Sequence, residues 1–216
     1  MSTSTATLYT KHKPISIIIL MWFMLILALS LNDIFIPPTG ESPVNILLSA
    51  AISVGFFMLA YWRITTFREY VLNIDMRFLI MLHSWRMIGM GFVMLYLFDI
   101  LPPLFAFLAG FGDAATAIAA VFLAYALFTN TQGVSKRLIW RWNTFGLLDF
   151  VIAVSVRILT QTDAILFAAN GVSSDLMTAF PFVLIPGFLV QLLTITHIFI
   201  YLQLHNNYKH QKFITQ

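Results

Sequence analysis

Six long apolar runs, separated by short polar segments, constrain the fold of this chain more than any other feature. Each run approaches or exceeds the roughly 20 residues that an α-helix needs to cross the hydrocarbon core of a bilayer. Only 10% of the 216 residues are charged, whereas soluble domains have about 25%. We therefore predict an all-α, polytopic membrane protein with a single domain of six transmembrane helices over residues 15–204. The predicted spans are residues 15–31, 44–62, 78–98, 104–128, 139–159 and 179–204, with polar tails over 1–14 and 205–216.

The charges of the connecting segments predict the orientation of this bundle. Lys and Arg gather in both tails and in the second and fourth loops, whereas the first, third and fifth loops carry acidic residues. Because basic loops stay on the cytoplasmic side of a membrane, we predict that both termini are cytoplasmic. The net charge of +3 does not indicate a nucleic-acid partner, since the basic residues flank the apolar runs and the bilayer is the expected partner.

Short local patterns predict features of individual segments of the bundle. The basic tail and the first apolar run also resemble a signal peptide with a cleavage-like site at residues 28–30, but the run is long for such a segment. Residues 63–77 are expected to be partly helical along the membrane surface, and Pro186-Gly187 is expected to kink the last span. Asn143 and Arg157 lie near span ends, where we expect them to face lipid headgroups or to snorkel towards them.

Three charged residues fall inside the predicted spans at similar depths. At a rise of about 1.5 Å per residue, Asp113 and Asp149 lie near the middle of the membrane, and the long side chain of Arg86 reaches their level. Buried charges are costly unless they are paired, so we expect Arg86 to pair with Asp113 and to be shared with Asp149. One arginine and two aspartates leave one negative charge, which a proton, a histidinium or a bound cation would balance. The same pairing has a structural interpretation, as a clamp between the third and fourth spans.

Two histidines and a row of methionines define a second candidate site. His83 and His197 lie at matched depths nearer to the cytoplasm, which would suit axial ligands of one b-type haem. In a regular α-helix, one face of the third span presents His83, Arg86, Met87, Met90 and Met94. The methionines and His83 would suit Cu(I), so the identity of any metal or cofactor stays open. Hydrogen-bonded interior histidines and methionine packing explain the same residues without a ligand.

Several short patterns resemble a family of small, functionally uncharacterised bacterial multi-pass membrane proteins. They are Arg86-x-x-Gly89, Leu101-Pro102-Pro103-Leu104-Phe105-Ala106, Ala109-Gly110-Phe111-Gly112-Asp113, Trp142-Asn143-x-x-Gly146-Leu147-Leu148-Asp149 and Pro181-x-x-Leu184-Ile185-Pro186. The resemblance covers about residues 80–200, and it differs at Ala114-Ala115-Thr116-Ala117, where members of that family carry more glycine. It implies a shared helical bundle in a bacterial cytoplasmic (inner) membrane and assigns no catalytic residue.

Three functions remain open at this point. The first is binding or transport of a small solute or a proton at the Arg86, Asp113 and Asp149 cluster. The second is a membrane redox protein that holds haem b, or copper, through His83 and His197 or through the methionines. The third is a structural or accessory subunit with a membrane-protein partner or a second copy of the chain. An enzyme is not favoured, because no Ser-His-Asp set or His-Glu-x-x-His motif occurs and cysteine is absent.

Overall fold

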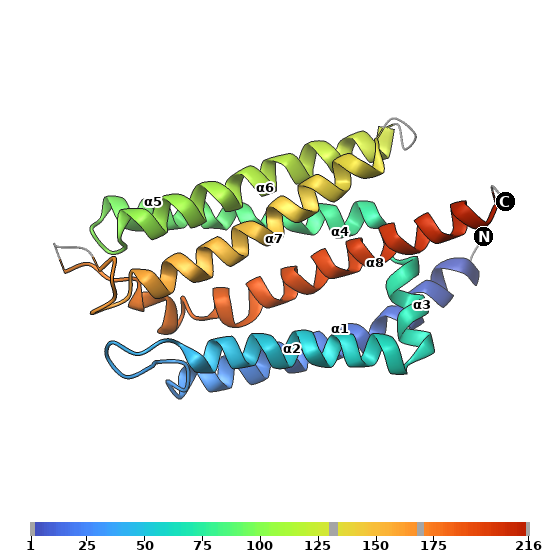
Figure 1. The fold of residues 1–216 in the computed structure, drawn as a ribbon. Coiled ribbons are helices and arrows are strands. Elements are labelled where there is room, and N and C mark those ends of the chain that lie inside the picture. The colour runs from blue at the N-terminus through green and yellow to red at the C-terminus, as the bar shows by residue number, and fades with distance from the viewer. Residues whose placement is uncertain (1–2, 130–133, 168–170, 215–216) are drawn as a thin grey trace.

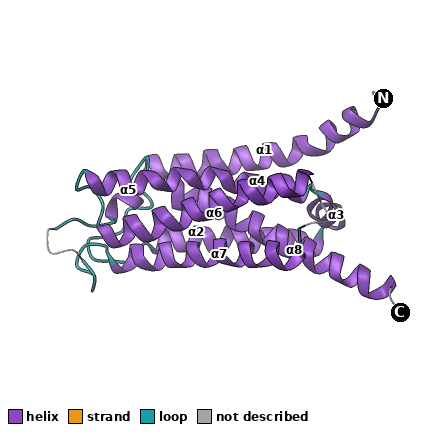
Figure 2. Cartoon of the chain, turned by 90° about the horizontal axis from the view of Figure 1, so that it is seen from above, coloured by secondary structure: helices purple, strands orange, loops and turns teal. Residues whose placement is uncertain are grey.

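The computed structural model describes residues 3–129, 134–167 and 171–214, and every regular element within these ranges is helical, which confirms the all-α prediction. Most elements run side by side as a bundle, and α3 (Thr65–Asn73) crosses one end of it (Figure 1 and Figure 2). The long helices are α1 (Thr3–Leu31), α2 (Val44–Arg63), α6 (Pro103–Thr129), α7 (Lys136–Leu159) and α8 (Val190–Ile214). The remaining elements are α4 (Met76–Leu82), the 3-10 helix η1 (His83–Gly89), α5 (Met90–Leu97), the 3-10 helix η2 (Asp175–Thr178) and the π-helix η3 (Ile185–Leu189).

Five helical stretches of the described chain are long and apolar enough to cross a membrane, which indicates a membrane protein. They are Val44–Arg63, Met76–Leu97, Pro103–Thr129, Lys136–Leu159 and Ile185–Asn206, and they correspond to the second to sixth predicted spans. The apolar part of α1, Ile15–Leu31, is shorter, so a sixth span remains a prediction. The helix of α1 begins at Thr3 and therefore also includes residues that we expected to form a tail.

The last span departs from its predicted start. Helical structure begins at Ile185 rather than at residue 179, and the first turns form the π-helix η3 instead of an α-helix. Pro186 has no N–H to donate, so it cannot continue a regular ladder of hydrogen bonds. The irregularity falls where Pro186-Gly187 was expected to kink the span.

Large apolar side chains cover the outside of the bundle. Phe56, Trp85 and Phe122 are 69%, 71% and 69% exposed, and many other aromatic and aliphatic side chains are also exposed. Apolar patches of this extent mark a surface that another apolar phase covers. Lipid chains are the phase that fits the length of these helices.

The two described ends of the chain lie at the same end of the bundle, where α3 also lies (Figure 1). Gln203 on α8 holds α3 in place, because its amide donates to the main-chain carbonyls of Val71 at 2.8 Å and Ile74 at 2.9 Å. These carbonyls belong to the last turn of α3 and its C-cap, which have no partners within the helix. Helical structure over 65–73 confirms the expectation that residues 63–77 are partly helical, and their position along the membrane surface stays a prediction.

Small residues let α6 approach its neighbours closely, and this approach positions the candidate site. The buried small residues of α6 are Ala106, Ala109, Gly110, Ala114, Ala117, Ala120 and Ala124. α6 contacts α5, η1 and α7 along its length. Without bulky side chains between helices, polar groups on adjacent helices can meet directly.

Candidate functional site

The 3-10 geometry of η1 determines which side chains of the third span face the interior. Side chains three residues apart line up in a 3-10 helix, and the buried residues of η1 are His83, Arg86 and Gly89. The predicted α-helical face is therefore wrong in part. Met87 and Met94 are 43% and 55% exposed.

Arg86 connects three helical elements through its guanidinium. Its Nε donates to Asp113 Oδ1 of α6 at 2.7 Å, and its Nη2 donates to Asp149 Oδ2 of α7. Its Nη1 donates to the main-chain oxygen of Gly146 at 3.0 Å. The side chain of Arg86 is 1% exposed, that of Asp113 is 14% exposed and that of Asp149 is 6% exposed. The ring of Phe150 lies 3.8 Å from Cζ of the guanidinium, so one face of the cation is covered by an aromatic ring.

Three glycines make room for this charge cluster. A Cβ at Gly89 would lie 2.5 Å from Asp113 Oδ2, and a Cβ at Gly112 would overlap Asp149 Oδ1. A Cβ at Gly146 would lie 2.7 Å from His197 Nε2 and 3.0 Å from Arg86 Nη1. Each carboxylate therefore gives one oxygen to Arg86 and packs its other oxygen against the main chain of a glycine. No larger residue fits at these positions without movement of the cluster.

The hydrogen bonds of His197 identify its neutral tautomer. The amide Nδ2 of Asn143 donates to the main-chain oxygen of His197 at 3.0 Å, which leaves Asn143 Oδ1 as an acceptor. His197 Nδ1 lies 2.7 Å from this oxygen and must therefore carry a hydrogen. Its Nε2 lies 3.2 Å from Arg86 Nη1 and accepts from it. Both ring nitrogens of His197 are thus occupied by protein groups.

His83 has the opposite tautomer and one vacant nitrogen. The hydroxyl of Thr196 donates to the main-chain oxygen of Leu193 at 2.8 Å, so its oxygen accepts from His83 Nε2 at 3.1 Å. His83 Nδ1 then carries a lone pair, and this buried atom has no hydrogen-bond partner. The rings of His83 and His197 lie 4.0 Å apart, so the two histidines and Arg86 form one connected cluster rather than two layers.

This arrangement does not fit the redox hypothesis. Imidazole rings 4.0 Å apart leave no room for a porphyrin between them, and both nitrogens of His197 are engaged. The copper set does not converge either, since Met87 and Met94 point outward and Met90 is only half-buried. Among the described residues, no group of three or more His, Cys, Asp or Glu side chains could hold a metal ion.

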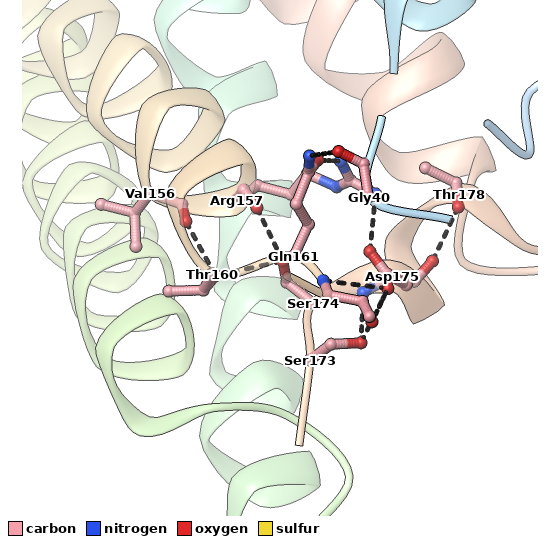
Figure 3. A network of polar contacts seen from close by, with 10 residues as sticks. Gly40, Val156, Arg157, Thr160, Gln161, Ser173, Ser174, Asp175 and Thr178 are labelled. Carbon is pink, nitrogen blue, oxygen red and sulfur yellow. Dashed lines mark hydrogen bonds and ion pairs between the residues drawn. The ribbon is translucent and has the colours of Figure 1, made fainter. Parts of the chain in front are cut away.

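A second polar network ties together loops at the end of the bundle away from the chain termini (Figure 3). Arg157 Nη1 donates to Gln161 Oε1 at 2.8 Å, and its Nη2 lies 3.4 Å from Asp175 Oδ1. Asp175 also accepts from the main-chain N–H of Thr162 at 3.2 Å and from the hydroxyl of Ser173 at 3.0 Å. The network fixes the end of α7 to the segment that leads into η2.

The expected headgroup positions of Arg157 and Asn143 are therefore wrong. Arg157 is 7% exposed and Asn143 is 0% exposed. Partners on other segments of the bundle explain the difference, because Asp175 pairs with the arginine and His197 with the asparagine. Depth along a single helix does not reveal such partners.

Sequence reasoning missed several residues of the site, namely Gly89, Asn143, Gly146, Phe150 and Thr196. The helical spacing of Trp142, Asn143, Gly146, Asp149 and Phe150 could have found most of them, since these residues form one buried face of α7. The signal is visible only when polar, small and aromatic residues are counted together as one face of the helix.

Asn143→Leu is expected to lower the free energy of unfolding by about 2–3 kcal/mol. The substitution leaves the Nδ1–H of His197 buried without a partner and removes the additional bond that Asn143 donates to the main-chain oxygen of His197. Unfolding of the detergent-purified variant measures the effect. Ser155→Ala is the matched control, because this exposed hydroxyl bonds only within its own helix. A loss no larger than that of the control would contradict the assignment.

Comparison with known proteins identifies one family. The family described as Domain of unknown function (DUF8737) matches residues 43–205, which include α2 and the whole charge cluster. This agrees with the expectation of a family that has no assigned activity. Searches of the curated proteins and of the solved structures gave no significant match.

Proposed function

The chain belongs to the family described as Domain of unknown function (DUF8737), and we propose that it binds a proton at the Arg86, Asp113 and Asp149 cluster and passes it across the membrane. The single observation that carries this proposal is the charge of the cluster. One buried guanidinium contacts two carboxylates, and both adjacent histidines have the hydrogen bonds of neutral imidazoles.

The cluster has one negative charge in excess if both carboxylates are ionised. An uncompensated charge in a region of low dielectric constant is strongly unfavourable, and it is removed by pairing or by protonation. Arg86 can neutralise only one of the two carboxylates. A proton on Asp113 or Asp149 makes the whole cluster neutral and leaves every hydrogen bond to Arg86 in place.

The packing of the cluster favours a proton over a larger solute. The free oxygens of Asp113 and Asp149 lie against Gly89 and Gly112 so closely that even one Cβ would collide with them. A solute would have to displace these contacts before it reached the carboxylates. A proton needs no additional volume.

His83 supplies a second position for the proton. Its Nδ1 has a lone pair without a hydrogen-bond partner, and its ring lies 4.0 Å from the ring of His197, which contacts Arg86. An imidazole nitrogen with a free lone pair can accept a proton. His83 is therefore the group that would exchange a proton between the cluster and one side of the membrane.

The proposal includes six spans, with α1 as the first, and cytoplasmic termini in a bacterial inner membrane. Support comes from the distribution of charge, since α3 and the start of α7 carry basic residues at the end of the bundle where both described chain ends lie (Figure 1). The loops at the other end carry acidic residues, including Asp99 and Asp163. Basic segments stay preferentially on the cytoplasmic side.

A structural or accessory role is the second candidate. The observation that favours it is that Arg86 bonds to side chains or main chain of α6, α7 and α8 at the same time. Such a clamp would hold the helices in register without moving a proton. Neutralising one carboxylate should lower proton flux if the cluster transfers a proton, whereas a purely structural clamp has no flux to lose.

Proton flux into sealed vesicles tests the proposal. The protein is reconstituted with a pH-sensitive dye inside, and a pH gradient is imposed. Asp113→Asn and Asp149→Asn should each lower the flux, on the order of a hundredfold for loss of one positioned proton-transfer group. Each variant keeps one balanced ion pair with Arg86, so both should fold. Asp163→Asn in the loop is the matched control and should leave the flux unchanged.

Two outcomes would contradict proton transfer. The first is wild-type flux no greater than that of vesicles without protein. The second is flux that persists in both asparagine variants. Normal folding together with absent flux in the wild type would instead support the structural clamp.

A further inference from the structure

A cleft lies between the beginning of α7 and the later part of α8, at the end of the bundle near the chain termini (Figure 1). It has a volume of about 460 Å³ and is lined by Lys136, Arg137, Trp140, Tyr201, Leu204 and His205. Three of these residues are basic, and their side chains are exposed. None of its lining residues belongs to the Arg86 cluster, although Tyr201 lies about one helical turn beyond His197 on α8, and the cleft takes no part in the proposed proton transfer.

The position of the cations within α7 is electrostatically unfavourable by itself. Lys136 and Arg137 are the first two residues of the helix, whose first turn contains no acidic residue. A helix N-terminus carries a positive partial charge, which favours anions and disfavours cations. Ser135 satisfies only one of the free N–H groups, since its hydroxyl accepts from Leu138 N at 3.2 Å. An anion in the cleft would interact favourably with the N-terminus of α7 and with the adjacent basic side chains.

The walls of the cleft are aromatic and fixed in position. The rings of Trp140 and Tyr201 lie 5.9 Å apart, and the hydroxyl of Tyr201 lies 2.6 Å from Thr144 Oγ1. Trp140 is 52% exposed. Tryptophan and tyrosine prefer the boundary between lipid chains and water, where one part of the side chain is apolar and the other is wet. The cleft thus combines cations with an amphipathic aromatic wall at the end of a membrane-length helix.

We propose that this cleft binds the phosphate of an anionic phospholipid. Lys136 and Arg137 would contact the phosphate, and Trp140 and Tyr201 would lie beside the glycerol and the first part of the acyl chains. Basic pockets between transmembrane helices have the chemistry that recognises anionic headgroups. A zwitterionic headgroup would bring its own cation and gain less from this site.

Native mass spectrometry of the full-length, detergent-purified protein tests the proposal. Phosphatidylglycerol and phosphatidylcholine with identical acyl chains are added separately, and the bound lipid is counted. The wild type should retain phosphatidylglycerol in preference to phosphatidylcholine. Lys136→Gln/Arg137→Gln should weaken phosphatidylglycerol binding by about fivefold for each cation removed. Arg137→Lys preserves the charge and should keep most of the preference.

Arg63→Gln/Arg68→Gln is the matched control, because it removes the same charge from exposed residues at the end of α2 and on α3, outside the cleft. This control should change the preference by less than about twofold, since charges outside the cleft act only through the screened surface potential. Equal retention of the two lipids by the wild type would overturn the proposal, as would an equal loss in the control variant. Displacement of the lipid by an equal concentration of inorganic phosphate would overturn the assignment to a phospholipid.

Discussion

Arg86→Met is expected to destabilise the protein more than any other single substitution in its membrane-length helices, by about 3–5 kcal/mol. The substitution keeps an apolar stem of similar length but removes the cation that, among the residues that the structure describes, pairs with both Asp113 and Asp149. Two adjacent buried carboxyl groups would then both need protons. It also removes the donor to Gly146 and to His197. Thermal and denaturant unfolding in detergent would measure the loss.

Neutralisation of the carboxylates provides the decisive control. Arg86→Met/Asp113→Asn/Asp149→Asn has no buried charge at the cluster and should recover a large part of the lost stability. Arg77→Met is the control, because it removes an arginine from an ion pair with Asp75 in which the side chains of Arg77 and Asp75 are 40% and 45% exposed. It should change the free energy of unfolding by less than about 1 kcal/mol. If Arg86→Met were no more destabilising than Arg77→Met, the buried cluster would not be the structural centre of the bundle.

Gly112→Ala is expected to have the second largest effect, at or above the roughly 3 kcal/mol typical of severe overpacking. The added Cβ would overlap Asp149 Oδ1, and that carboxylate cannot retreat without breaking its bond to Arg86. Proton flux should fall together with stability, because the same movement separates Asp149 from the guanidinium. Denaturant unfolding and the vesicle assay would report the two effects separately.

Gly91→Ala is the matched control for the glycine substitution. Gly91 lies in α5 near the cluster in sequence, but a Cβ there would meet no atom within 4 Å. In a helix, alanine is preferred over glycine by about 1 kcal/mol, so this variant should be as stable as the wild type or more so. A similar loss in Gly91→Ala and Gly112→Ala would show that the contact with Asp149 does not determine the result.

The bundle could be predicted from the sequence because an apolar run of about 20 residues is stable as a helix that spans the lipid, while its polar flanks stay in water. Four of the five membrane-length helices begin within a few residues of the predicted spans. Arg86, Asp113 and Asp149 stood out for the same reason, since charged residues are rare inside such runs. Their similar depth followed from the helical rise alone, and the structure brings the three side chains into contact.

The rest of the site depends on local helix geometry and on contacts between helices, which the spacing of apolar residues does not reveal. The third span was interpreted as a regular α-helix, which placed Met87 and Met94 beside His83. The 3-10 segment from His83 to Gly89 shifts the interior face to every third residue instead. Nothing in the local composition separates these two geometries, and the close approach of Gly89 to Asp113 involves another helix.

The polar partners of the histidines could not be predicted from the sequence either. Asn143 was expected at the headgroups because it lies near the start of its span, but its amide is oriented by His197 on α8. Likewise, the tautomer of His83 depends on a hydrogen bond that Thr196 donates to Leu193. Contacts between helices distant in sequence decide these roles.

Infrared spectroscopy of the carboxyl groups tests the central claim most directly, because a protonated carboxyl and an ionised carboxylate absorb at separate frequencies. The wild type in detergent at neutral pH should show the band of one protonated carboxyl group, shared by Asp113 and Asp149. That band should disappear in Asp113→Asn and also in Asp149→Asn, since Arg86 then neutralises the single remaining carboxylate. Absence of the band from the wild type, or its persistence in both variants, would contradict a proton bound at the cluster.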